Sequence, residues 1–425
     1  MEITSQAKKK IAVIGAGAAG LTAAYLLNKS HDVFLFEKNS YFGGHANTVT
    51  VNDYDNGTLD VDTGFIVFND KNYPNFTKLI NELAVSYQKS DMSFSYYSKK
   101  PFKLYSSDIP FGMFALKRNL INFKFYKFLY SILAFNKAAI VDVENGIDIE
   151  LTLRQYLNKY NYPSQLIDDY IVPMGAAIWS ASFSEILEFP ARTFLNFWNN
   201  HGLLQLQGRP QWFTVTGGSR NYVKHIIKSL QHKPQDSSYI LSVNRTNSYA
   251  VIKMKDGVEH VFDKVVIATH ADEALRLLGD PTNDEKRLLG VWSYSNNKTY
   301  FHTDTRVMPS REVAWTAWNY VKESTDPEDP VSLTYWMNRL QKLPSKVPYL
   351  VTLNTKIDID PAKIIREINY THPIFSAKSL ASQSSLSSLN GKHQTYFCGS
   401  YFKNGFHEDA VSSGVEVAKL LGIEW

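Results

Sequence analysis

The sequence contains a single cysteine, Cys398, in 425 residues. One thiol cannot form an intramolecular disulfide or a thiolate metal cluster, so we predict neither, and we predict no metal site. This cysteine usage is typical of the reducing cytoplasm, which is where we expect the protein to work.

Long apolar runs are also missing, because no stretch of about 18 uncharged apolar residues occurs. We therefore expect no membrane-spanning helix. Residues 1–17, MEITSQAKKKIAVIGAG, have a short apolar run without a small-residue cleavage site, which argues against a signal peptide. The formal net charge of +4 is too small to indicate a nucleic-acid partner.

Apolar and aromatic residues are plentiful. Hydrophobic residues make up 44% of the chain and aromatic residues 14%, a composition typical of a globular protein. The length suggests two or three domains. The aromatic content suits a large apolar ligand cavity, and it equally suits a thick hydrophobic core.

The clearest motif is a glycine loop between two short predicted strands, 11–14 and 33–36. Gly15 permits a tight turn, Gly17 lets the backbone approach a pyrophosphate, and Gly20 lets the following helix pack on the strand. The helix N-terminus attracts phosphate charge. Glu37 ends the second strand, where a carboxylate can accept hydrogen bonds from a ribose. This context predicts a dinucleotide-binding βαβ unit.

Two further motifs favour FAD over NAD. Gly43-Gly44-His45 and then Gly64-Phe65 would let the backbone run along a ribityl-diphosphate chain and pass close to a flat ring. Near the C-terminus a predicted strand ends at Gly399, and a helix begins near Glu408. The N-terminus of such a helix would stabilise negative charge on a reduced flavin. Acids are favoured in any first helical turn, so we expect the backbone there to matter more than the Glu408 and Asp409 side chains.

These stretches resemble the flavin-containing amine-oxidase and phytoene-desaturase superfamily, and within it a bacterial group of predicted NAD/FAD-binding, amine-oxidase-like proteins. The closer resemblance lies in FGGHANTV (42–49), VDTGFIVFN (61–69), PMGAAIWS (173–180), NHGLL (200–204), RPQWFTVTGGSRNYV (209–223), KVVIATHADEAL (264–275), AWTAWNY (314–320) and GFHEDAVSSG (405–414). It implies an α/β fold with a Rossmann-like FAD-binding domain of the glutathione-reductase type, interleaved with an α+β substrate domain. We predict 1–75, 213–290 and 385–425 for the first domain, and 76–212 and 291–384 for the second.

The resemblance implies FAD as the cofactor and a set of residues around it. That set is Gly15, Gly17, Ala18, Ala19, Gly20, Glu37, Lys38, Gly44, His45, Gly64, Phe65, Val243, Ala268, Gly399, Ser400, His407, Glu408, Asp409 and Ala410. Amine oxidases usually carry a basic residue before the paired glycines, where this chain has Tyr41-Phe42. They also carry an acid where this chain has Ser400. An amine substrate therefore does not follow from the resemblance.

The group that the chain resembles is associated with enzymes that modify unsaturated fatty acyl chains, which implies an acyl or lipid substrate. Residues 109–137 carry five basic and no acidic side chains. At helical spacing Lys117, Lys124 and Lys127 share one side, while Phe114, Ile121, Phe125, Leu129 and Ile132 cluster on another. Such a segment could lie on the inner membrane as a peripheral contact, or it could be a lid or core helix with solvated lysines.

We expect hydride transfer between flavin N5 and an unsaturated or methylated acyl chain, as a desaturase or an isomerase. The catalytic candidates are His45, Lys298, His302 and Tyr401, and His407 is a further acid–base candidate. Two alternatives stay open. One is an amine oxidase acting on a small amine, and the other is a non-catalytic flavoprotein partner of a lipid-modifying enzyme.

Overall fold

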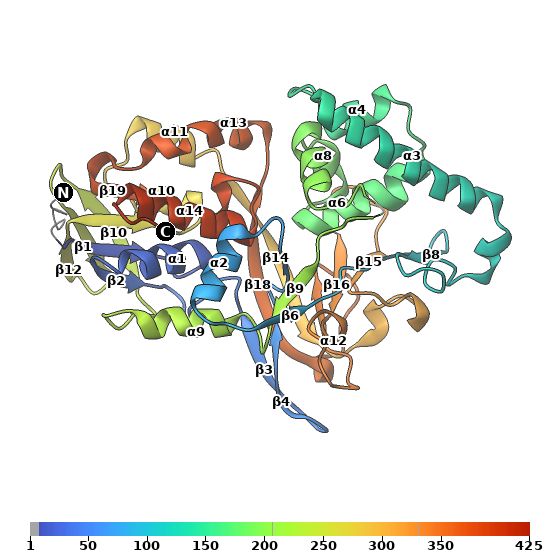
Figure 1. The fold of residues 1–425 in the computed structure, drawn as a ribbon, viewed down its shortest axis with the longest axis horizontal. Helices are drawn as coiled ribbons and strands as arrows, with labels where there is room; N and C mark the ends of the chain where they lie inside the picture. The colour runs from blue at the N-terminus through green and yellow to red at the C-terminus, as the bar shows by residue number, and fades with distance from the viewer. Residues whose placement is uncertain (1–7, 206, 330) are drawn as a thin grey trace.

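The computed structural model describes residues 8–205, 207–329 and 331–425. One half of the molecule contains the N-terminal strand together with later segments of the chain, and we call it the N-terminal half. It is built on a parallel sheet in the order β19-β13-β1-β2 (Figure 1). The strands are β1 (Lys10–Ile14), β2 (Asp32–Phe36), β13 (Lys264–Ile267) and β19 (Thr395–Phe397). Since all pairs are parallel, the carboxyl ends of all four strands meet at one edge.

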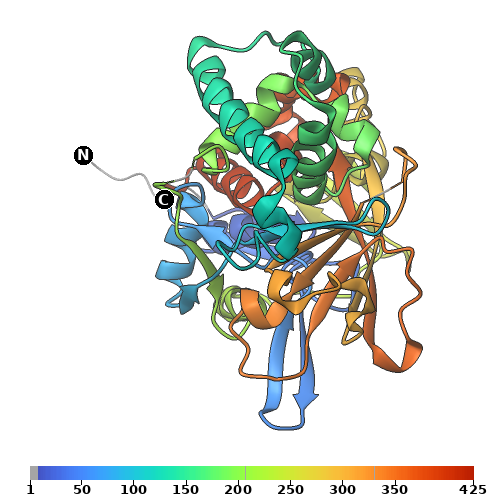
Figure 2. The same ribbon diagram turned by 90° about the vertical axis from the view of Figure 1, so that its right-hand side faces the viewer.

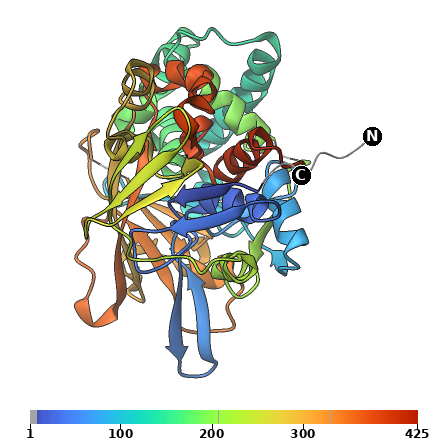
Figure 3. The same cartoon turned by 90° about the vertical axis from the view of Figure 1, so that its left-hand side faces the viewer.

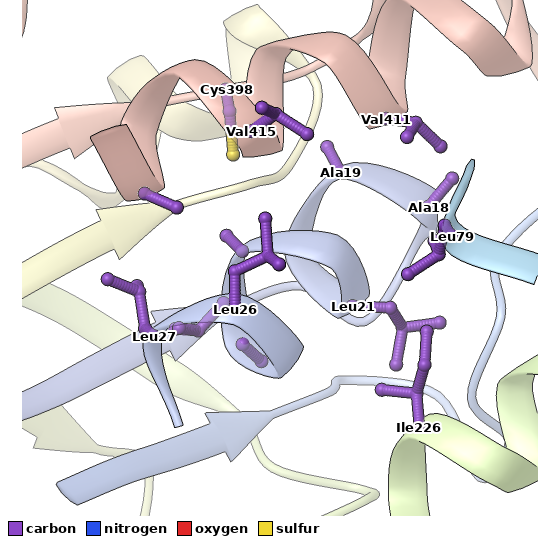
Figure 4. Packing of buried hydrophobic residues seen from close by; sticks show 14 of the residues in the cluster. Ala18, Ala19, Leu21, Leu26, Leu27, Leu79, Ile226, Cys398, Val411 and Val415 are labelled. Atoms are coloured by element: carbon purple, nitrogen blue, oxygen red, sulfur yellow. The ribbon is translucent and has the colours of Figure 1, made fainter. Parts of the chain in front are cut away.

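Helix α1 (Ala18–Leu27) follows β1 directly and packs against α14 (His407–Leu420) at the other end of the chain (Figure 4). Small residues make the close approach possible, since a Cβ on Gly414 would lie 2.5 Å from the carbonyl oxygen of Ala19. Val411, Val415 and Cys398 fill the contact, so the lone cysteine is a buried packing residue.

Further elements surround this sheet. An antiparallel sheet, β10 (Ile240–Arg245), β11 (Ala250–Met254) and β12 (Glu259–Phe262), contributes to the core on the other face of the parallel sheet (Figure 3). The helices near these two sheets are α2 (Pro74–Glu82), α9 (Arg220–Ser229), α10 (Ala271–Leu277), α11 (Asn283–Leu289) and α13 (Ala377–Leu386).

The second half-molecule is a seven-stranded sheet in the order β18-β14-β17-β16-β15-β7-β8. Only β15 and β7 run parallel, and the other pairs are antiparallel. The strands are β7 (Phe94–Ser98), β8 (Lys103–Ser106), β14 (Ser293–His302), β15 (Trp318–Lys322), β16 (Ser332–Trp336), β17 (Leu350–Leu353) and β18 (Ile364–Ile374).

A group of helices lies against one side of this sheet (Figure 2). They are α3 (Phe123–Asn145), α4 (Leu153–Lys159), α6 (Val172–Trp179), α7 (Phe183–Leu187) and α8 (Ala191–Asn200). Their aromatic side chains form one cluster with residues of β7, β8, β15 and β16. No helix among the described residues is long and apolar enough to cross a membrane.

Two small sheets lie between and beside the halves. The hairpin β3 (Thr48–Asp53) and β4 (Gly57–Asp62) projects at the bottom of Figure 1. Strands β5 (Phe68–Asn69), β6 (Tyr87–Lys89) and β9 (Trp212–Val215) form the other sheet.

Two of the predicted domain boundaries fall inside helices. The boundary at 75/76 falls inside α2, whose Phe76 and Leu79 pack in the same core as α1 and α14. The boundary at 384/385 falls inside α13, whose Leu386 packs with α11. Both helices bury their apolar side chains against the N-terminal half, and sequence pattern does not reveal which half a helix packs on.

Candidate functional site

A cavity of about 1090 Å³ lies between the two halves. It begins at the carboxyl ends of β1, β2 and β13 and extends to α6, β16, β17 and β18 of the second half. Ligands of doubly wound sheets bind outside this carboxyl edge, so the cavity is the candidate site.

The glycine loop forms one end of the cavity. Gly15 has a φ of +98°, and a Cβ there would lie 2.8 Å from the carbonyl oxygen of Ala268. A Cβ on Gly17 would meet no atom within 4 Å, so that position faces empty space at the N-terminus of α1. These features fit a pyrophosphate, which needs backbone N–H groups and room for its oxygens.

Gly20 serves packing rather than the cavity. A Cβ there would come within 1.9 Å of the carbonyl oxygen of Gly15, and Gly20 is not part of the lining. Gly20 therefore lies inside α1 against Gly15 and Ala268, and its direct contact with a cofactor stays a prediction.

Glu37 lies at the end of β2 with its carboxylate at the cavity edge. One oxygen accepts a hydrogen bond from the backbone N–H of Ala16 at 2.8 Å, and the other accepts from that of Asn39 at 2.9 Å. Lys38 also lines the cavity and forms an ion pair with Glu273. Carboxylate lone pairs remain for ribose hydroxyls, which is the role that the sequence predicts for Glu37.

Aromatic rings gather where Gly44 and Gly64 meet β18. The His45 ring stacks on Tyr370 at 4.9 Å and lies 5.2 Å from His372. Nε2 of His45 is buried and has no hydrogen-bond partner among the described residues. Burial, with smaller contributions from the neighbouring histidines, holds the pKa of His45 well below its usual value. The ring is therefore neutral at neutral pH and has one nitrogen available for a ligand.

The sequence did not single out His372 or His270, which also line the cavity. Burial lowers the pKa of His372 to about 4 and also lowers that of His270. Nδ1 of His372 accepts a hydrogen bond from the Asn297 amide at 2.9 Å. For His372 the sequence offers no signal beyond the residue type, because β18 reads as a mixed polar stretch that shows neither its length nor its position. His270 lies in the segment 264–275 that carries the resemblance.

The C-terminal segment lines the cavity through Gly399, Ser400, Tyr401, His407 and Ala410. The His407 ring stacks on Phe65 at 3.6 Å, and its Nε2 lies 3.1 Å from the Tyr222 hydroxyl. Burial lowers the pKa of His407 to about 3, so its ring is neutral. The Tyr401 hydroxyl is buried without a hydrogen-bond partner among the described residues.

The two acids at the start of α14 do not line the cavity. Glu408 accepts hydrogen bonds from the backbone N–H groups of Asn75 and Phe76, which caps α2. Asp409 accepts from the backbone N–H groups of Asn404 and Phe406. Both carboxylates are therefore held by backbone N–H groups outside the cavity, and at the start of α14 it is His407 and Ala410 that line the cavity.

Three other predicted residues lie elsewhere. Lys298 sits farther along β14, with its amino group 3.3 Å from Glu367 and its side chain 52% exposed. His302 is buried inside the seven-stranded sheet and hydrogen bonds to Thr352 at 2.8 Å. Val243 is buried in β10, and its carbonyl accepts from the Gly279 N–H. None of the three lines the cavity, so the structure does not bring them together with the other predicted site residues.

The far end of the cavity is lined by apolar and neutral polar side chains. Ile178, Trp179, Leu353, Phe375 and Phe406 contribute to its wall, and behind them Phe197 stacks on Phe406 at 4.6 Å. The charged side chains of the lining are Glu37, Lys38, Asp272, Glu273 and Arg276, and all five come from the N-terminal half. The end formed by the second half therefore offers aromatic surface and a few neutral polar groups, without an ionic partner for a substrate.

Comparison with known proteins gives one family match and a set of related folds. Residues 13–83 match the model of an NAD(P)-binding Rossmann-like domain. No curated protein is similar enough in sequence to match the chain. A CLA-producing fatty acid isomerase from P. acnes has the same fold, with a TM-score of 0.70, 14% identity, and coverage of 99% of this chain and 100% of the isomerase.

Two further structures cover nearly the whole chain. Putrescine oxidase bound to putrescine gives a TM-score of 0.68 at 13% identity, with 97% of this chain and 99% of the oxidase covered. A putative protoporphyrinogen oxidase from Exiguobacterium sp. 255-15 gives 0.64 at 13% identity, with 98% and 99% covered. At these identities the comparisons establish a shared two-part architecture.

Proposed function

The chain has the fold of the flavin-containing amine-oxidase-like superfamily, and from this premise we propose that it is an FAD-dependent oxidoreductase acting on a fatty acyl chain, unsaturated or methylated. One observation carries the substrate proposal. The cavity reaches from the phosphate-type glycine loop to an aromatic wall that has no charged side chain.

The residues around the cavity fit FAD at each part of its length. The loop 15–19 and the start of α1 would hold the pyrophosphate, and Glu37 would hold the adenosine ribose. Gly44, His45, Gly64 and Phe65 would lie along the ribityl chain and ring. The start of α14 would face the other side of the ring, where its backbone N–H groups stabilise negative charge. Bound there, FAD supplies the acceptor for a hydride from the substrate.

The aromatic end would hold an apolar chain straight against the ring and keep water away. Trp179 and Phe406 present flat apolar surfaces, and burying a chain there is favourable at about 0.8 kcal/mol per CH₂ group. An acyl chain that loses a hydride and a proton is desaturated. A chain that gives up only the hydride, keeps its proton and regains the hydride at another carbon is isomerised, with no net change in oxidation state.

The neutral histidines are the groups at hand for the proton. His45 and His372 are unprotonated at neutral pH, so either could accept a proton from a substrate carbon next to a double bond. Neither carries a charge that would repel an apolar chain before the reaction.

An amine oxidase acting on a small amine is the second candidate. A substrate ammonium needs an anionic partner or an aromatic cage close to the ring. Tyr401 could form one side of such a cage, but the cavity end of the second half supplies no carboxylate. Charge complementarity therefore favours the acyl chain. A flavoprotein that binds lipid without reacting is the third candidate.

The test is to mix the FAD-loaded protein anaerobically with an unsaturated fatty acid, with a phospholipid carrying the same chain, and with putrescine. We expect a change in the number or position of acyl double bonds. Bleaching of the flavin band by putrescine alone would contradict the proposal. Acyl chains with unchanged double bonds, together with an unbleached flavin, would point to the non-catalytic candidate. The Gly17→Val variant, which fills the space at the loop, serves as a cofactor-free control.

A further inference from the structure

Large apolar side chains are exposed together at the end of the molecule opposite the N-terminal strand (Figure 1). We call this surface the apolar tip. It is formed by the turn after β7, the loop 107–122 and the first turns of α3. Its members are Phe102, Ile109, Phe111, Leu120, Ile121, Phe123, Tyr126, Tyr130 and Leu133. Ile121 is 90% exposed and Phe123 is 81% exposed.

Single exposed apolar residues are normal, but a contiguous set of this kind marks an interaction site. The tip contributes nothing to the lining of the cavity. It also differs from the surface that the sequence predicts. Phe125 is buried, and Phe114, Leu129 and Ile132 pack against the core of the second half. Of the five apolar residues that the sequence groups on one side of this segment, only Ile121 is exposed.

The exposed face of α3 explains this difference. Phe123, Lys127, Tyr130 and Lys137 recur every three to seven residues along α3, and all are exposed. They therefore share one side of the helix, while Phe125, Phe128 and Phe135 occupy the buried side. Helix α3 is thus apolar on both sides, and its outer side mixes aromatic rings with lysines.

The charge around the tip is of one sign. Residues 109–141 contain Lys117, Arg118, Lys124, Lys127 and Lys137 and no acid. All five are exposed, and none of them forms a salt bridge within the described ranges. Lys99 and Lys100 in the neighbouring turn are also exposed.

Arg118 joins two parts of the surface. Its guanidinium donates a hydrogen bond to the Phe102 carbonyl at 2.7 Å and lies 5.6 Å from the centre of the Phe102 ring. The turn after β7 is thereby held next to the loop before α3. The two segments present their apolar side chains as one surface.

We propose that the apolar tip docks on the anionic face of a phospholipid bilayer. The aromatic rings would enter the interfacial layer, where Tyr and Phe are accommodated, and the lysines would pair with anionic headgroups. Lysine stems can lie along apolar surface while the amino groups stay in the headgroup layer. A mixture of exposed rings and cations without acids matches a negatively charged, partly apolar surface.

The buried side of α3 extends toward the cavity. Phe135 packs on Trp198 at 6.3 Å, Trp198 on Phe194 at 4.7 Å, and Phe194 on Trp179 at 5.5 Å. Trp179 belongs to the cavity wall. Docking through the tip would therefore place the second half of the protein, rather than the N-terminal half, next to lipid. The docking proposal holds whatever the substrate of the cavity proves to be.

The test is co-sedimentation of the FAD-loaded protein with vesicles. One set contains phosphatidylglycerol in phosphatidylcholine, and the other contains phosphatidylcholine alone. We expect binding to the anionic vesicles at least about tenfold tighter than to the neutral ones, and weaker binding as salt is raised.

Two double variants divide the surface into its parts. Ile121→Ser with Phe123→Ser removes apolar side chains, and Lys124→Glu with Lys127→Glu reverses charge. Both change exposed residues, so the fold should be kept. We expect each double variant to weaken binding to anionic vesicles by at least about tenfold.

Matched controls lie elsewhere on the surface. Lys224→Glu with Lys228→Glu reverses two exposed charges on α9, and Tyr54→Ser removes an exposed ring between β3 and β4. We expect both to bind vesicles as the unchanged protein does. Equal weakening by tip and control variants would overturn the proposal, as would no binding to either vesicle set. A dimer in solution that Ile121→Ser with Phe123→Ser dissociates would also overturn it, in favour of a second copy as the occupant.

Discussion

The carboxylate of Glu37 accepts a hydrogen bond from the backbone N–H of Ala16 at 2.8 Å. The residue predicted to hold the ribose thus also fixes the loop predicted to hold the pyrophosphate. The two parts of a dinucleotide site are coupled through one buried side chain, and this coupling can be tested by substitution.

Replacing Glu37 by Leu should weaken FAD binding and also destabilise the protein without FAD. The backbone N–H groups of Ala16 and Asn39 would lose their acceptor, at a cost of about 1–3 kcal/mol for each buried donor left without a partner. Thermal unfolding with and without FAD measures both effects. Glu37→Gln keeps one acceptor oxygen and should be milder in both. A Glu37→Leu protein that unfolds and binds FAD as the unchanged protein does would refute the coupling.

The two glycines Gly17 and Gly20 should respond differently to the same substitution. At Gly17 a side chain meets no atom within 4 Å, so Gly17→Val should fold normally and lose FAD. At Gly20 a Cβ would come within 1.9 Å of the Gly15 carbonyl oxygen, so Gly20→Val should lower the stability itself. The flavin content of the purified protein and its unfolding without cofactor give the comparison. Equal loss of stability in both variants would show that Gly17 is also a packing residue.

The pKa of His372 should make stability depend on pH. Its pKa is about 4 in the folded protein, below the value of 6.5 for an unperturbed histidine. Between these values the unfolded chain binds a proton that the folded protein does not bind. The contribution of His372 to stability should therefore fall as the pH drops from 6.5 to 4 and should level off below 4.

His372→Gln tests this expectation, because Gln also offers an acceptor to the Asn297 amide. The variant should lose less stability between pH 6.5 and pH 4 than the unchanged protein. The difference should be on the order of 1 kcal/mol, since the ring borders a cavity that admits water. Chemical denaturation at several pH values measures it. Parallel pH profiles for the two proteins would contradict the assignment.

Lys298→Met should leave turnover and the flavin spectrum unchanged. The lysine pairs with Glu367 on the protein surface, where water and salt screen the pair and it contributes little to stability. His302→Ala should instead lower stability by about 1–3 kcal/mol, because Thr352 and the backbone N–H of Asp304 lose a buried partner. A large drop in turnover for Lys298→Met would place that lysine in the reaction. Lys356→Met is the matched surface control.

Trp179→Ala should impair the acyl reaction and leave FAD content nearly unchanged. The indole packs on Phe189, Phe194 and Phe197 at the wall of the second half, away from the glycine loop. Removing such a side chain costs about 3–5 kcal/mol of stability, so the conservative Trp179→Phe is needed beside it. Steady-state kinetics with acyl chains of different length should show a raised KM in Trp179→Phe. Unchanged kinetics in this folded variant would remove the indole from the substrate site.

Much of the N-terminal half was predictable from sequence because its signals are local. Gly15, Gly17 and Glu37 mark the end of a strand, a turn and the end of the next strand, all between residues 11 and 37. The C-terminal strand and helix that pack on this half were also predictable, since Gly399 and the start of α14 carry their own turn and helix signals. Local signals of this kind survive without knowledge of the tertiary packing.

The second half was less predictable because its signals depend on packing. His372 and Tyr370 face the cavity only because β18 is long enough to cross between the halves. Lys298 has the residue type of a catalytic base, but its position along β14 carries it past the cavity. For α3 the sequence shows apolar residues on two sides, and only the packing of Phe125 and Phe128 decides which side stays exposed.

The strand order β19-β13-β1-β2 has a consequence for biosynthesis. Strands β1 and β2 leave the ribosome first, but the sheet stays incomplete until residues 395–397 have followed. During translation β13 would keep one edge unpaired until residues 395–397 have been made. Premature stop codons anywhere before β19 should therefore yield a product that cannot assemble its nucleotide site, however much of the chain has been made.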